Sequence, residues 1–139
     1  MSKVVYNVKI DGVDQMLSNL MKIDESIRSN VALEAVQEGA SIIQARGVMN
    51  APVKTGQLRN SFKTESRKTA TGAEAEVGPH TVYARIQELG GYTGRGHKTK
   101  ITGKFYLSRA VEETRGQVST AMAEAIQDYL LNRGPNGHL

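Results

Sequence analysis

The sequence predicts an α+β fold in which a small antiparallel sheet packs against a long helix and a C-terminal helix. Residues 4–10 alternate apolar and polar side chains and are rich in β-branched residues, which predicts an N-terminal strand. Two further alternating segments within residues 58–78 predict a central β-hairpin. Apolar side chains at helical spacing over residues 24–50, and again after residue 108, predict the two helices. The length of 139 residues fits a single domain, residues 1–139.

The first half of the chain is predicted to be mainly helical. Residues 16–21 show the spacing of a short amphipathic helix, and the long helix follows over residues 24–50. That helix would be about 40 Å long at the usual rise per residue. Pro52 disfavours helical geometry in the residue before it, so we expect the helix to end there. Gly39 and Gly47 are weak points within it, each costing about 1 kcal/mol relative to alanine.

A turn-rich bridge over residues 52–56 leads into the predicted hairpin. Its first strand starts near Leu58 and continues to residue 69, and its second strand covers residues 73–78. In the second strand glutamates alternate with small or apolar residues, so one face of the hairpin should be in contact with water.

The last third of the chain is predicted to hold a short helix, a loop and the C-terminal helix. The short helix covers residues 83–89, and the glycine-rich, basic segment at about residues 90–104 shows no periodicity, which predicts an exposed, flexible loop. Ser108 is the expected N-cap of the last helix. Residues 134–139 contain two glycines and a proline and predict a frayed tail.

The charge of the chain is unevenly distributed. Twelve basic and four acidic residues lie from Arg46 to Arg109, whereas the rest of the chain holds six basic and ten acidic residues. The segment from Leu89 to Arg109 contains no carboxylate. Such a bipolar chain suits contact with nucleic acid, and it equally suits head-to-tail contact between copies of itself.

Composition and motifs exclude several classes of function. The chain has no cysteine, which excludes disulfides, thiolate metal sites and cysteine nucleophiles. No apolar stretch approaches the length of a membrane span, and the N-terminus lacks a signal-peptide core. We therefore expect a soluble protein in a reducing compartment.

No catalytic or cofactor motif stands out. His80, His97 and His138 are not spaced as metal ligands, so we expect no metal site. The glycines of residues 91–96 lack the Gly-Lys-Ser/Thr of a phosphate-binding loop, and no serine has the context of a nucleophile elbow. We therefore predict no enzymatic activity and no cofactor.

Four short stretches occur in an order that resembles a known family. They are APVKTGQLRNS at residues 51–61, Val-Gly at 77–78, YARIQELG at 83–90 and FYLSRA at 105–110. The series resembles the tail-completion, or head–tail joining, family of tailed bacteriophages and prophages. The chain departs from the family pattern at Leu89, where an aromatic residue is usual, and around Phe105, where the expected prolines are absent.

The resemblance implies a structural protein of the virion. It implies a ring of copies at the phage neck, with six copies favoured over twelve, which joins the DNA-filled head to the tail and lets DNA pass without sequence-specific binding. The implied partners are other copies of the chain, portal-side head-completion proteins, and tail terminator or tail-tube proteins, with no membrane. Assembly would take place in the cytoplasm of the bacterial host.

The expected interface residues are basic and apolar side chains of the central part of the chain. We expect Arg59, Arg85 and Arg109 to form ion pairs between subunits, and Tyr83, Phe105 and Leu107 to act as anchors. The loop with its four cations should become ordered at an interface or line the lumen: Arg95, Lys98, Lys100 and Lys104.

A second hypothesis remains open: a sequence-independent nucleic-acid-binding module that uses the basic, glycine-rich loop. It predicts DNA binding that weakens steeply with salt and with neutralisation of Lys98 and Lys100. Tyr92 is the one aromatic residue of that loop, which is weak support for base stacking.

Overall fold

The computed structural model describes residues 8–10, 25–53, 56–70 and 72–133. The strands of the described part are β1 (Val8–Ile10), β2 (Lys63–Lys68), β3 (Ala73–Gly78), β4 (Gly91–Thr93) and β5 (Thr99–Ile101). The helices are α2 (Glu25–Asn50), α3 (Gln57–Asn60), α4 (Ala84–Leu89), the 3-10 turn η1 (Arg95–His97) and α5 (Tyr106–Arg133).

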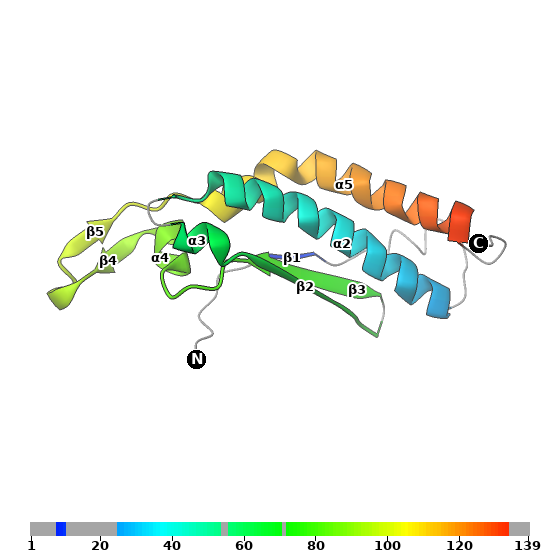
Figure 1. Cartoon of the computed structure of the whole chain (residues 1–139), viewed down its shortest axis with the longest axis horizontal. Helices are drawn as coiled ribbons and strands as arrows, with labels where there is room; N and C mark the ends of the chain where they lie inside the picture. Colours follow the sequence, from blue (N-terminus) through cyan, green and yellow to red (C-terminus); the bar gives the residue numbers. More distant parts are fainter. Residues whose placement is uncertain (1–7, 11–24, 54–55, 71, 134–139) are drawn as a thin grey trace.

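The molecule is elongated, and its two long helices lie side by side (Figure 1). Helix α2 packs against α5 on one side and against the sheet strands β2 and β3 on the other. The hairpin β4–β5 extends beyond this layered body at one end, where α3 and α4 also lie (Figure 1). The predicted α+β fold is therefore confirmed. The helix predicted at residues 16–21 and the tail predicted at residues 134–139 lie outside the described residues.

The main sheet has the strand order β1-β3-β2, and both pairings are antiparallel. Alternate residues of β3 from Ala73 to Val77 are buried against α2, while the glutamates between them point to the other face. There Arg67 lies 2.8 Å from a carboxylate oxygen of Glu74 and 3.4 Å from one of Glu76. The predicted hairpin with one wet face is confirmed.

The two glycines of the long helix lie where other parts of the core approach it most closely. A Cβ atom at Gly39 would lie 3.0 Å from Sδ of Met122 in α5, and one at Gly47 would lie 2.9 Å from Cε2 of Phe62. Glycine lowers the helix propensity at these two positions, but it allows the side chains of Met122 and Phe62 to pack closely against the helix. The predicted length of the helix is confirmed, since α2 ends at Asn50, two residues before Pro52.

One boundary of the hairpin differs from the prediction. Leu58 was expected to start the first strand, but it lies in the short helix α3, and β2 begins only at Lys63. Gly56 precedes this helix in a left-handed conformation, with φ of 77°, that few other residues adopt. The side chain of Leu58 is buried, so this helical turn places it in the core.

Candidate assembly interface

The stretch at residues 51–61 connects the long helix to the sheet. Ala51 is buried at the end of α2, and Arg59 reaches back to that end. Its Nη2 donates a hydrogen bond to the carbonyl of Met49 at 3.2 Å, and its Nε donates one to the carbonyl of Ala51 at 3.3 Å. These carbonyls have no partner within the helix, and a cation there also interacts favourably with the helix dipole. Arg59 therefore has an internal role, although it was expected to pair with a neighbouring subunit.

Helix α4 supplies the cap of the C-terminal helix. Glu88 is fully buried, and its carboxylate accepts hydrogen bonds from the backbone N–H of Leu107 at 2.8 Å and of Ser108 at 3.0 Å. The hydroxyl of Ser108 donates to the same carboxylate. Helix α5 begins at Tyr106, so the prediction that Ser108 is the N-cap is wrong. A carboxylate from another helix satisfies the free N–H groups and sits at the positive end of the dipole.

The hairpin β4–β5 is fixed at its base, which we call the root (residues 87–90 and 103–108). The N–H of Lys104 donates to the carbonyl of Gln87 at 2.8 Å, and the N–H of Phe105 donates to that of Glu88 at 3.0 Å. Gly90 and Gly103 face each other so closely that a Cβ on either would lie 2.7 Å from backbone atoms of the other side. The root therefore joins the hairpin to α4 and α5 through backbone contacts.

Tyr106 ties the same region to the core. Its hydroxyl donates a hydrogen bond to the carbonyl of Ala84 at 2.8 Å, and its ring packs edge-to-face on Phe62 with centroids 6.1 Å apart. The side chain is fully buried. The start of α5 is thereby held to α4 and to the beginning of β2.

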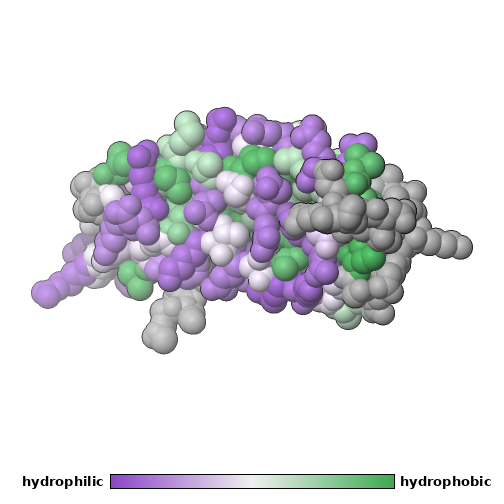
Figure 2. All heavy atoms as spheres, turned by 45° about the vertical axis from the view of Figure 1, so that its right-hand side comes forward, coloured by the Kyte–Doolittle hydropathy of each residue, from purple (hydrophilic) through white to green (hydrophobic). Residues whose placement is uncertain are grey.

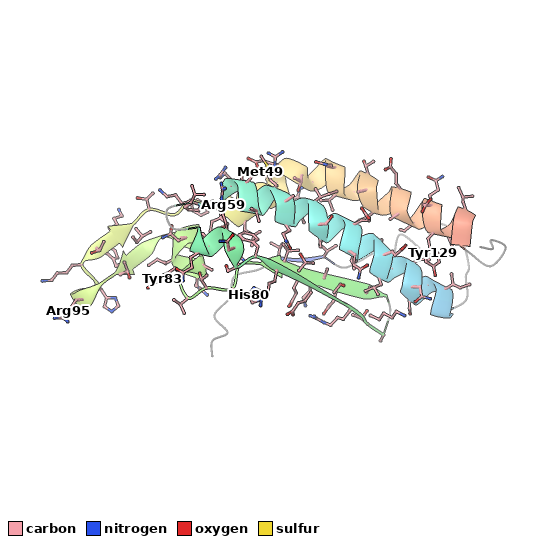
Figure 3. All side chains as sticks on the ribbon, viewed as in Figure 1. Met49, Arg59, His80, Tyr83, Arg95 and Tyr129 are labelled. Carbon is pink, nitrogen blue, oxygen red and sulfur yellow. The ribbon has the colours of Figure 1, made fainter. Side chains whose placement is uncertain are left out.

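Residues 90–104 form a two-stranded hairpin, which corrects the predicted irregular loop. Gly91 pairs with Ile101, Tyr92 with Lys100 and Thr93 with Thr99, in antiparallel register. The outer part, residues 94–99, which we call the tip, is exposed throughout. Arg95 lies at the far end of the molecule, as Figure 3 shows. Strands of three residues leave too little sequence for a period of two to be recognised.

A pocket of about 540 Å³ lies between this hairpin and the rest of the molecule, and we call it the root pocket. Its lining comes from α3, α4, β5 and the segments next to them: Pro52, Gln57, Leu58, Thr81, Tyr83, Gln87, Lys100, Ile101, Thr102 and Lys104. The lining combines apolar and polar side chains and includes two lysines and no carboxylate. Such a concave, partly apolar surface is suited to receiving a side chain of a partner.

Exposed apolar side chains gather at the same end of the molecule. In the described part, all the large apolar side chains that are exposed, except Leu131, lie between residues 49 and 105: Met49, Val53, Val82, Tyr83, Leu89, Tyr92 and Phe105. The face shown in Figure 2 is mainly hydrophilic, with separate hydrophobic patches along its length. Aromatic residues, methionine and arginine are enriched in protein interfaces, so this end is the candidate interface.

Most of the residues predicted at the interface lie together at this end. Seven exposed ones come from the start of α4, the hairpin and its root: Tyr83, Arg85, Arg95, Lys98, Lys100, Lys104 and Phe105. Tyr83 borders the root pocket and Arg95 lies at the tip (Figure 3).

Two further predicted interface residues contact their own chain, as Arg59 does. Leu107 is fully buried next to Gly47 in the core, so its side chain is out of reach of a neighbouring subunit. Arg109 donates to the carbonyl of Lys104 at 3.2 Å and lies 3.8 Å from the carboxylate of Glu113, one turn along α5.

Sequence reasoning missed part of this surface. Val53 and Val82 are more than half exposed and flank the root pocket residues Pro52 and Thr81, although neither valine had been singled out. Val53 lies within the stretch at residues 51–61, directly after a proline that follows a helix. Because connecting segments run over the surface of a protein, the sequence could have predicted that this valine is exposed. Glu88 gave no signal, because its role depends on residues 19 positions later.

Two classes of site are not found in the described part of the chain. There, no three histidine, aspartate or glutamate side chains gather closely enough to hold a metal ion. None of the described helices combines the length and the apolar character needed to cross a membrane.

The family model HK97-gp10-like, with the description "Bacteriophage HK97-gp10, putative tail-component", matches residues 14–90, more than half of the chain. The chain has no significant match among curated proteins or among solved structures. The match includes three of the four stretches that carried the resemblance and ends at the root of the hairpin. The chain therefore belongs to the HK97-gp10-like family of bacteriophage tail components.

Proposed function

We propose that this tail component is a subunit of a ring at the phage neck, which joins the head to the tail and surrounds the path of the DNA. The ring has six subunits rather than twelve, matching the symmetry of a tail tube. The role is one of assembly, with no catalysis and no cofactor. The ring is built in the cytoplasm of the bacterial host and remains in the virion.

The observation that carries this proposal is the difference between the two ends of the elongated molecule. One end exposes apolar side chains and cations around the root pocket. Toward the other end, a groove between α2 and α5 includes four carboxylates in its lining: Glu34, Glu38, Glu124 and Asp128. Two ends of different character favour head-to-tail contacts between copies. Such contacts form a closed ring when the rotations between successive copies add up to a full turn.

The tip of the hairpin is assigned to the lumen or to the next ring. It carries Arg95 and Lys98, and its whole length from residue 94 to 99 is exposed. Cations that face DNA without reading its bases bind the phosphates in a salt-dependent way, which allows the DNA to slide. The portal-side head-completion proteins and the tail terminator or tail-tube proteins are the partners above and below the ring.

The test combines the mass of the assembly with its affinity for DNA. We expect light scattering to give a defined oligomer, with rings visible in negative-stain electron micrographs, or else a monomer that forms rings only on tails. Titration of duplex DNA at 50 and 200 mM salt should show weak binding at both concentrations. A strict monomer that binds DNA tightly at low salt and loses the affinity steeply at high salt would contradict the proposal and favour the nucleic-acid-binding module.

A further inference from the structure

We propose that the contact between neighbouring subunits is made by the last turns of α5 of one copy, with Leu131 seated in the root pocket of the next copy. The inference rests on the proposed ring and names the surfaces that build it. The partner of the root pocket is thus a second copy of this chain.

Leu131 is the apolar side chain that this contact requires. It is 72% exposed, and in the described part it is the one large apolar side chain exposed outside residues 49–105. Its neighbours Tyr129 and Leu130 are partly buried against the core. Most of the other exposed side chains of α5 are polar, and an exposed leucine among them can fill a preformed, partly apolar pocket.

Two carboxylates accompany Leu131 on the same side of the helix. Glu124 and Asp128 precede it by seven and three residues, so the three side chains form one stripe along α5. Both carboxylates are exposed, and both line the groove shared with α2. The stripe that carries the leucine therefore holds two carboxylates.

The root pocket has the complementary character. Leu58 and Ile101 supply apolar walls, and Lys100 and Lys104 supply positive charge at its border. The segment from Leu89 to Arg109, which contributes both lysines, contains no carboxylate that would repel the acidic stripe. Complementary charges around an apolar anchor speed the encounter of the two copies and fix the register of their contact.

The contact has to form between copies. Leu131 lies 25 residues after Tyr106 in one continuous helix, about 37 Å along its axis. Tyr106 belongs to the root, so the pocket and the leucine of one chain lie at opposite ends of the molecule. Each copy therefore offers one pocket and one anchor, which is the condition for a head-to-tail chain of contacts.

Cysteine pairs test the contact directly, because the chain has no cysteine of its own. A Leu131→Cys chain mixed with a Thr102→Cys chain should form disulfide-linked dimers about ten times faster than the control mixture of Leu131→Cys with Thr120→Cys. Thr102 lines the root pocket, whereas Thr120 is exposed on α5 away from it. Equal rates in the two mixtures would overturn the proposal. This result is also the one expected if the natural occupant of the pocket is another tail protein.

Charge reversal separates a specific contact from chance collision. Adding Lys100→Glu and Lys104→Glu to the Thr102→Cys chain should lower the cross-linking rate about tenfold. Adding Glu124→Lys and Asp128→Lys to the Leu131→Cys chain should then restore the rate. All four side chains are exposed, so the variants should fold as the parent does. Failure of the second pair to restore the rate would contradict the assigned pairing.

A chain that carries both cysteines distinguishes the contact from the ring. A ladder of linked species that ends in a closed ring supports both proposals. A ladder that continues into open filaments supports the contact and contradicts the ring. A ring of the parent protein without selective cross-linking contradicts the contact and leaves the ring in place.

Discussion

The root and the tip of the hairpin β4–β5 belong to one short segment, yet they differ in almost every physical property. The root contains the fully buried Glu88, backbone hydrogen bonds to α4, and two glycines in close contact. The tip is exposed and basic. A stiff root sets the direction in which the hairpin projects, and the exposed tip is left for contact with other molecules. Substitutions of buried or closely packed residues in the root should therefore change stability, and those in the tip should change only binding.

The largest effect is expected for Leu107→Ala at the root. The side chain is fully buried beside Gly47, so its removal leaves a cavity and should lower the free energy of unfolding by about 2–5 kcal/mol. Urea unfolding followed by circular dichroism measures this loss. The matched control is Leu131→Ala in the same helix, which should change stability by less than about 0.5 kcal/mol because that leucine is exposed. Equal effects of the two substitutions would contradict the distinction between core and interface.

A smaller but still marked effect is expected for Glu88→Gln. The amide keeps the shape but removes the charge that faces the N–H groups of Leu107 and Ser108, which should cost about 1–3 kcal/mol. Thermal unfolding measures this loss of stability, and amide hydrogen exchange at the start of α5 measures the local weakening. Glu112→Gln is the control, since that side chain is 72% exposed and pairs only with Arg115 one turn away. Unchanged exchange rates at Leu107 and Ser108 would show that the cap contributes little.

The close contact at the root predicts opposite signs for one substitution at two places. Gly103→Ala puts a Cβ 2.7 Å from the carbonyl carbon of Leu89, and should cost about 1–3 kcal/mol as the backbone shifts. Gly116→Ala in α5 meets nothing within 4 Å and should stabilise the protein by up to about 1 kcal/mol. Differential scanning calorimetry of both variants gives the comparison. Stabilisation by Gly103→Ala would mean that the root is looser than described.

The same contrast explains which parts of the structure could be predicted from the sequence. Helix α2 and strands β2 and β3 carry their own periodicity, and Pro52 marks the end of the helix, so local reasoning was sufficient. The hairpin β4–β5 has three residues in each strand, and its position depends on hydrogen bonds that the segment after β5 donates to carbonyls of α4. No local pattern contains that information.

For the candidate site, exposure was predictable and burial was not. The cations of the hairpin were expected at the surface because charged side chains rarely lose their water, and they are exposed. Leu107 and Arg59 were expected to face a neighbour, but both contact α2 of their own chain. Whether an apolar or long basic side chain turns inward depends on which element packs next to it, and the match of the stretch at residues 51–61 to a family does not specify this.

The smallest effect on stability is expected at the tip, with the double substitution Arg95→Gln and Lys98→Gln. Both side chains are exposed, so the free energy of unfolding should change by less than about 0.5 kcal/mol. If the tip faces DNA, each lost phosphate contact should reduce the slope of log affinity against log salt by about 0.9, measured by titration of duplex DNA. Lys63→Gln on the wet face of β2 is the control and should leave the slope unchanged. A reduced slope for the control alone would place the DNA on the sheet, whereas unchanged slopes in both variants would assign the tip to protein contacts. In either case we expect the double variant to form the same ring as the parent protein. That result would show that the tip does not contribute to contact between copies, and that assembly depends on the root end and α5.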